Sequence, residues 1–405
     1  MRNRCSIAGW VAGLTLPVLS FGYTIANPQN RNARLLYILF FTFLGISYFY
    51  SGESADVTSY VANFEDARSL TNIGFLDYFY NTLPEARQID FYSAFMWWFV
   101  SRFTGNEHIY LGILALVNAL FFSANIAYVK RYANLNNKIS VLLIAVIVFV
   151  PSMTYLTHRW WTALQIFLFG LLPFIFERKY LMLIWCLVAA LLVHFSFLYP
   201  LVFVGLYILL PKRNVGVYVL LFIATALLNT FDFSSVATFV SRFLPDLTVE
   251  RTMSYIEAEH LEHNFFSQSG RLSMRVANIF LTTSLYLINF NKWNKDVTLR
   301  NLFCAALLFG SFASITSLTE WGWRYLDLSY ILLLSFYLYY LSDITRMSKA
   351  KQVFFIASPF FIWFVIFQIR LTLNIIGPNH LLMGNYITTW FLNDQNSVVD
   401  LLESL

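Results

Sequence analysis

The sequence predicts an all-α polytopic membrane protein with about 12 transmembrane helices and two larger outer loops. Three observations predict it. Only 12% of the 405 residues are Asp, Glu, Lys or Arg, about half the share usual in soluble globular chains. Apolar residues make up 58%. Apolar runs also recur along the whole chain, and about 20 such residues suffice for a helix to cross a bilayer.

Twelve apolar runs qualify as candidate spans, several of them short. They are 7–26, 35–50, 108–129, 139–157, 162–176, 181–194, 196–210, 215–230, 276–290, 302–318, 325–341 and 353–370. The first run lacks a small-residue cleavage pattern and contains Pro17. We therefore expect it to be a retained helix and not a signal peptide.

The lysines predict the orientation of these spans. All eight lysines of the chain fall in alternate connections, and cytoplasmic loops are the ones enriched in Lys and Arg. These connections are 27–34, 130–138, 177–180, 211–214, 291–301 and 342–352. The opposite, outer side carries 19 of the 22 acidic residues, and its basic residues are all Arg.

Two long outer loops, 51–107 and 231–275, interrupt what we expect to be a single integral membrane domain over residues 1–405. Segment 89–103 is aromatic but too short to span, so it is expected to lie at the interface. Loop 231–275 is a candidate lid over an outer site. His260 and His263 within it have a spacing that permits a metal site, although a solvated helix gives the same pattern.

Ionisable side chains at membrane depth are costly, so each is a functional hypothesis. In the predicted topology they gather at the outer ends of helices, and this common side favours a shared functional site. They are Asp56, Arg159, His194, Arg271, Arg275, Glu320 and Arg324.

Each of these residues also has a structural interpretation. Arg159 and Arg324 lie among tryptophans and are suited to snorkelling toward lipid headgroups. His194 at a hairpin tip is suited to satisfying a turn. Asp56 is placed to cap the helical segment 58–68.

Arg271 and Arg275, one helical turn apart, are spaced as interface anchors as well. The presence of arginine without lysine nevertheless indicates a phosphate ligand, because a guanidinium forms bidentate hydrogen bonds to phosphate and stays charged when partly buried. An outer arginine cluster therefore suits a lipid-linked pyrophosphate. Nucleotide-binding, zinc-protease and nucleophile-elbow motifs are absent from the sequence, and the scattered basic residues indicate no nucleic-acid partner.

Four motifs in order resemble the Wzy-type polysaccharide polymerases, in particular the EpsG-like branch, over roughly residues 35 to 345. They are the outer DVTSY (Asp56–Tyr60), HRWWTAL around Arg159, HFS (His194–Ser196) and the late pair Arg324–Tyr325. Two departures stand beside them. Trp160 follows Arg159 where that branch has Gln, and residues 51–54 replace its Arg-Gly-Thr.

The resemblance implies a membrane glycosyltransferase of GT-C-like architecture in the bacterial inner membrane, with its active site facing the periplasm. Such enzymes transfer a growing O-antigen, capsule or exopolysaccharide chain from undecaprenyl pyrophosphate onto a repeat unit on the same carrier. Both lipid-linked oligosaccharides and membrane lipid are the implied partners. A protein that regulates chain length is a further candidate partner.

This reaction requires a base for the acceptor hydroxyl and positive charge for the leaving pyrophosphate. The candidates for the base are His194, Glu320 and Asp56. Those for pyrophosphate are Arg159, Arg271, Arg275 and Arg324. Those for stacking on sugars are Tyr60, Trp160, Trp161, Trp321 and Trp323. No DxD carboxylate pair is present, so we expect metal-independent transfer without a cofactor.

Three alternatives stay open. A ligase of the O-antigen type would use arginines and a histidine in the same roles. A lipid-linked oligosaccharide flippase or other transporter requires charges along a central path, whereas the charges here lie near outer ends. A structural membrane subunit requires no outer arginine cluster.

Overall fold

The computed structural model describes residues 6–49, 55–70, 72–83, 91–150, 159–228, 265–290, 292–317 and 324–403. The described part of the chain is helical and has no β-strand beyond one isolated bridge, between Tyr48 and Ile376. Four helices are long and apolar enough to cross a membrane: α7 (Glu107–Lys130), α9 (Arg159–Glu177), α16 (Val297–Thr316) and α18 (Ile344–Leu373). The prediction of an all-α polytopic membrane protein is confirmed.

The chain divides into two compact units. The first comprises Met1–Tyr128, Pro151–Tyr199 and Ile369–Leu405. Besides most of α7 and all of α9, it contains α1 (Ile7–Thr15), α2 (Pro17–Ala26), α3 (Ala33–Ile46), α4 (Ala55–Ser69), α5 (Phe75–Asp77), α6 (Phe91–Ser101), α10 (Tyr180–Val193), α19 (Pro378–Met383) and α20 (Val398–Glu403). Short turns η1 (Tyr78–Thr82), η3 (Phe195–Phe197) and η6 (Thr388–Phe391) complete it.

The second unit comprises Val129–Val150 and Pro200–Gln368. It contains α16, most of α18, α8 (Lys138–Phe149), most of α11 (Leu198–Leu209), α12 (Val215–Leu228), α15 (Phe265–Ile288), the turn η4 (Trp293–Lys295) and α17 (Arg324–Ser342).

A helix is present at each of the twelve predicted spans, but several boundaries differ. The first run is not one helix, because α1 ends before Leu16 and α2 begins at Pro17. Proline lacks the N–H that would continue the helix, and it pushes the residue before it out of the helical region. Leu16 accordingly has φ −136° and ψ 60°. The predicted short helix in segment 89–103 is present as α6, 11 residues long.

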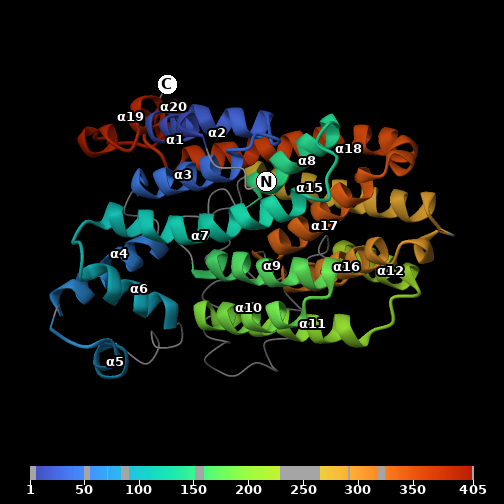
Figure 1. Ribbon diagram of the computed structural model, residues 1–405, viewed down its shortest axis with the longest axis horizontal. Coiled ribbons are helices and arrows are strands. Elements are labelled where there is room, and N and C mark those ends of the chain that lie inside the picture. The colour runs from blue at the N-terminus through green and yellow to red at the C-terminus, as the bar shows by residue number, and fades with distance from the viewer. Residues whose placement is uncertain are drawn as a thin grey trace. The chain divides into compact units, whose positions relative to one another are not determined.

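In the first unit, α9 and α10 run alongside each other, as Figure 1 shows in green. A Cβ added to Gly170 of α9 would lie 2.5 Å from the Cβ of Cys186 on α10. The absence of a side chain at Gly170 therefore permits this close approach, a device common between membrane helices. The pair carries Arg159 at the start of α9 and His194 just past the end of α10.

In the second unit, α16 and α17 pack against each other at the centre (Figure 1). Every residue from 301 to 314 and from 325 to 338 is buried. Helices that are apolar all round are expected in such a core. The helices α12 and α15 pack against this pair.

Some predicted features lie outside the described residues. They are Glu320, Trp321 and Trp323, the two histidines His260 and His263, and residues 231–264 of the candidate lid. Asp56 belongs to α4, but its side chain is outside the described part.

Candidate functional site

Arg159 and Tyr60, which the sequence places in two separate motifs, lie together in the first unit. Arg159 is the first residue of α9, and its guanidinium carbon lies 5.9 Å from the centre of the Tyr60 ring on α4. A cation at this distance over an aromatic face is attracted by the ring. Tyr60 is itself buried and packs near Trp97 of α6, with ring centres 6.4 Å apart. The ring thus helps to orient the guanidinium.

Trp160 and Trp161 are almost fully covered by protein, at 2% and 1% exposure. Their rings are 4.9 Å apart and nearly perpendicular. Trp160 also packs on Phe197 of η3, at 5.6 Å. Neither ring offers an open face in this structure, so their stacking on sugars stays a prediction. Their packing holds the start of α9 against the turn that follows His194.

His194 ends α10 and caps η3. Its Nδ1 accepts a hydrogen bond from the backbone N–H of Ser196 at 3.2 Å and lies 2.9 Å from the Ser196 hydroxyl. A nitrogen that accepts from a backbone N–H carries no proton, so the neutral ring bears its proton on Nε2. His194 therefore satisfies the hairpin turn, and its Nε2–H remains the group that can donate to a ligand.

The second unit brings together Arg271 and Arg275 of α15 with Asp327 and Tyr330 of α17. Arg271 lies within electrostatic reach of the Asp327 side chain, which is buried at 8% exposure. Both arginines lie within electrostatic reach of Tyr330. Arg275 lies close enough to the Tyr330 hydroxyl for their side chains to interact, but the buried Nε of Arg275 and that hydroxyl do not reach full hydrogen-bond geometry with any described residue. Unsatisfied buried donors are costly, and a bound anion would satisfy them.

Asp327 and Tyr330 were not predicted as site residues. Asp327 follows Arg324, the first residue of α17, by less than one helical turn. A carboxylate within an apolar run was the signal available in the sequence. Its partner on α15 was not identifiable, because the contact is between helices far apart in the chain.

Not every arginine on the predicted outer side is part of a candidate site. Arg102 donates through Nη2 to the carbonyls of Leu70 and Ile73, at 2.9 and 3.0 Å. Its guanidinium also lies over the Trp98 ring, 5.1 Å from the centre. Arg102 therefore ties the end of α6 to the segment after α4, which is a structural role.

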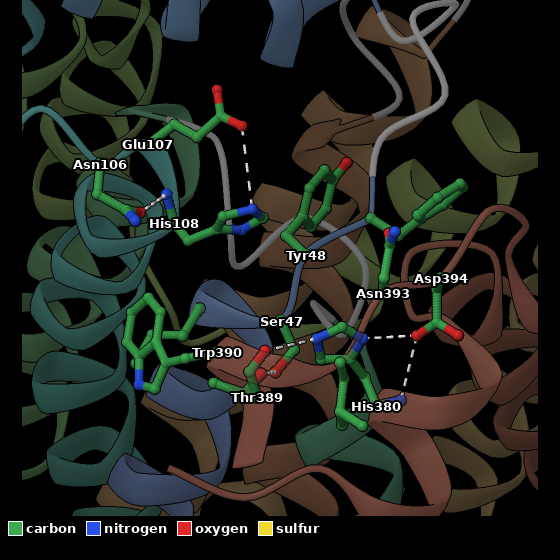
Figure 2. A pocket seen from close by; sticks show the side chains of 13 residues that line it. Ser47, Tyr48, Asn106, Glu107, His108, His380, Thr389, Trp390, Asn393 and Asp394 are labelled. Carbon is green, nitrogen blue, oxygen red and sulfur yellow. Dashed lines mark hydrogen bonds and ion pairs between the residues drawn. The ribbon is translucent and has the colours of Figure 1, made fainter. Parts of the chain in front are cut away.

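A polar pocket of about 300 Å³ lies at one end of the first unit, where α3 ends and α7 begins. Figure 2 shows Asn106, Glu107 and His108 on one side and the C-terminal segment on the other. The lining residues are Ile46, Ser47, Tyr48, Phe49, Asn106, Glu107, His108, His380, Thr389, Trp390, Leu392, Asn393 and Asp394. The sequence did not predict this pocket, because its walls come from three distant segments.

The C-terminal wall of the pocket is held by His380 and Asp394. Nδ1 of His380 lies 2.5 Å from Asp394 Oδ2, and its Nε2 lies 3.3 Å from the carbonyl of Thr389 (Figure 2). Asp394 also accepts hydrogen bonds from the backbone N–H groups of Asn379 and His380. Burial opposes ionisation, but these hydrogen bonds hold the pKa of Asp394 below its usual value. Both ring nitrogens of His380 are engaged, so the pair fastens the segment.

Metal ligands do not cluster in the described part of the chain, which contains no group of three or more His, Cys, Asp or Glu side chains arranged to hold an ion. Among the predicted site residues, the positive charge for an anion comes from arginine. Arg159 supplies it in the first unit, and Arg271, Arg275 and Arg324 supply it in the second.

Comparison with known proteins gives one match. The model of the EpsG family matches residues 33–380. No curated protein and no solved structure matches the chain. The matched range includes every described candidate residue of both units, from Tyr60 to Arg324, and ends at His380 of the polar pocket.

Proposed function

The chain belongs to the EpsG family of polysaccharide polymerase-type membrane proteins, and from this premise we propose that it joins lipid-linked glycan repeat units. The donor is a growing glycan on undecaprenyl pyrophosphate, and the acceptor is a repeat unit on the same carrier. The match to the EpsG family model confirms the resemblance to the EpsG-like branch at the level of the family. The substrates and the site residues are our proposal.

The proposed reaction is a single displacement. A hydroxyl oxygen of the acceptor forms a bond to the anomeric carbon of the donor. The bond from that carbon to the pyrophosphate oxygen breaks, and its electron pair leaves with undecaprenyl pyrophosphate. The hydroxyl proton passes to a base, for which His194, Glu320 and Asp56 stay the candidates. To act as the base, His194 must first release the Ser196 N–H from Nδ1, because Nε2 carries the proton in the structure. The site is proposed to face the periplasm.

The observation that carries the proposal is the pairing of Arg159 with Tyr60 inside the matched range. A guanidinium held by an aromatic ring is oriented before the substrate arrives, and it offers two parallel donors to a pyrophosphate. Such preorganised charge stabilises the negative charge that develops on the leaving group.

We propose Arg159, Arg271, Arg275 and Arg324 as the groups that bind pyrophosphate. The buried Nε of Arg275 and the nearby hydroxyl of Tyr330 support an anion beside them in the second unit.

We also assign the polar pocket of the first unit to a saccharide. Its volume of about 300 Å³ lies at the small end of the range for ligand pockets. Amides, hydroxyls and carboxylates line it, and these groups suit sugar hydroxyls. The Trp390 indole is partly exposed, and its Nε1 donates to the Tyr386 carbonyl at 3.1 Å, which fixes the ring.

The test uses the full-length protein in membrane vesicles with lipid-linked repeat units as the substrate, and a parallel reaction adds a lipid A core as a second acceptor. We expect a ladder of longer lipid-linked glycans that Arg159→Ala abolishes. Transfer only to a lipid A core would replace the proposal with the ligase. Transbilayer movement of unextended repeat units, with no ladder, would replace it with the flippase.

A further inference from the structure

A groove of about 1030 Å³ lies in the second unit, between the start of α8 and the first half of α18. It is far larger than the polar pocket and has a different lining. The residues are Asn134, Asn136, Asn137, Lys138, Ile139, Ile344, Met347, Lys351, Gln352, Phe355 and Ile356. The proposed polymerase chemistry makes no use of them.

Local hydrogen bonds fix one end of the groove. The Asn137 carboxamide oxygen accepts from the backbone N–H of Ile139 at 3.1 Å and so caps α8. Its amide nitrogen lies 3.1 Å from the sulfur of Met347 on α18. Asn137 thereby links the loop before α8 to α18 and sets the position of Lys138.

The groove has an apolar part and a basic part. Phe355, Ile356 and Ile344 are 74%, 57% and 71% exposed, although all three are large and apolar. Lys138 and Lys351 are exposed beside them. In the described part of the chain, neither lysine makes an ion pair or a side-chain hydrogen bond.

The acidic residues nearby are already engaged. Asp296 binds Arg346 at 2.7 Å, and Asp343 lies 3.8 Å from the same guanidinium. Positive charge is also crowded in this part of the unit, where the hydrogen bond and charge of Lys349 lower the pKa of Lys292. Both carboxylates are thus paired with Arg346 and not with the lysines of the groove.

We propose that this groove binds an anionic phospholipid, with the phosphate between Lys138 and Lys351 and the acyl chains along Phe355 and Ile356. An amphiphile with one anionic end matches both parts of the lining. Basic pockets between membrane helices on the cytoplasmic side hold such headgroups, and the lysine distribution predicts that side here. A soluble anion would leave the apolar part uncovered, and a second copy of the chain would bring more positive charge to it.

The test is native mass spectrometry of the full-length protein in detergent, titrated with phosphatidylglycerol or phosphatidylcholine. We expect one phosphatidylglycerol to bind more tightly than phosphatidylcholine. The double variant K138A/K351A should lose this affinity by about fivefold for each lysine removed, since one lysine near an anionic surface contributes about 1 kcal/mol.

Two controls separate the site from general effects. K179A/K212A removes two lysines from other connections on the same predicted side and should keep the bound lipid. K138R/K351R keeps both positive charges and should also keep the bound phosphatidylglycerol, which shows that the groove still folds. Excess glycerophosphoglycerol, the headgroup without acyl chains, should not displace the lipid.

Three results would overturn the proposal: equal phosphatidylglycerol affinity in K138A/K351A and the unchanged protein, equal affinity for both lipids, or displacement by the soluble headgroup. If the unchanged protein is a dimer in detergent and K138A/K351A is a monomer with unchanged phosphatidylglycerol affinity, the groove is assigned to a second copy of the chain. None of these readouts depends on polymerase activity.

Discussion

The Arg159 guanidinium lies over the Tyr60 ring at 5.9 Å, joining the start of α9 to α4 within one compact unit. Asp56 precedes Tyr60 by one turn of the same helix. Two motifs recognised separately in the sequence are therefore parts of one arrangement. This arrangement gives the first prediction.

Arg159→Ala should reduce polymer to single repeat units while the protein inserts normally, because it removes the oriented cation proposed for the leaving group. Arg159→Lys keeps the charge but not the two-pronged geometry, and it should retain less than about a tenth of the activity if that geometry supplies about 1.4 kcal/mol or more. Glycan length on gels measures both. Equal activity of the lysine variant would show that charge alone suffices.

His194→Asn tests whether the imidazole does more than close the turn. The Asn oxygen can accept from the Ser196 N–H in place of Nδ1, so the hairpin should survive and the melting temperature should change little. Polymer should still be lost if Nε2 contacts substrate. The matched control is Ser196→Ala, which removes the 2.9 Å hydroxyl contact but keeps the backbone donor. Full polymerisation by His194→Asn would leave the histidine a purely structural role.

Tyr330→Phe should separate stability from function in the second unit. The hydroxyl is buried beside Arg275 and does not reach full hydrogen-bond geometry with any described residue, so its removal should leave the melting temperature unchanged or raise it. Polymerisation should fall if the hydroxyl and Arg275 bind an anion. Unchanged polymer yield together with a raised melting temperature would contradict an anion at this position.

Arg102→Ala should lower the stability of the protein and leave its activity unchanged, whereas Arg159→Ala should abolish activity and leave insertion normal. Arg102→Ala removes the donor that the carbonyls of Leu70 and Ile73 share. Both carbonyls keep another donor, from the Ile73 N–H and the Trp98 indole, so the cost is about 1 kcal/mol for each hydrogen bond lost. The protein should melt at a lower temperature, and polymer made per folded molecule should stay near normal. Thermal unfolding in detergent, paired with activity normalised to folded protein, measures the two effects. A normal melting temperature would argue against the tie.

Asp394→Asn should destabilise the C-terminal segment in a pH-dependent way. The pKa of Asp394 is lower in the folded protein, so its contribution is present above the unfolded value of about 3.9 and is lost as pH falls through the folded value. The melting temperatures of variant and parent should differ at pH 7 and converge in acid below about pH 4. A difference that persists in acid would mean that the charge is not what stabilises the segment.

The sequence predicted the helices well because apolar runs and prolines act locally. It placed Arg159 and His194 at helix ends, and the structure has them there. It did not anticipate the break at Leu16, although Pro17 was noticed. Proline is favoured in the first turn of a helix, so Pro17 is better interpreted as the start of a second helix than as a residue within one continuous span.

Contacts between segments far apart in the chain could not be predicted from the sequence. Asp327 meets Arg271 only because α15 packs beside α17, and His380 meets Asp394 only after the chain turns back. Hydrophobic period fixes which face of a helix is buried, but not which helix covers it. Trp160 shows the same limit, since its ring packs against Phe197 of η3.

The polar pocket also has a consequence for biosynthesis. Ser47 contacts Thr389 at 3.1 Å, Tyr386 donates to the Leu39 carbonyl, and Tyr48 pairs with Ile376. The end of α3 emerges early from the ribosome, whereas its partners are translated hundreds of codons later. The pocket is therefore finished only after most of the chain has been made, and a chain that ends before residue 376 has no C-terminal wall for this pocket.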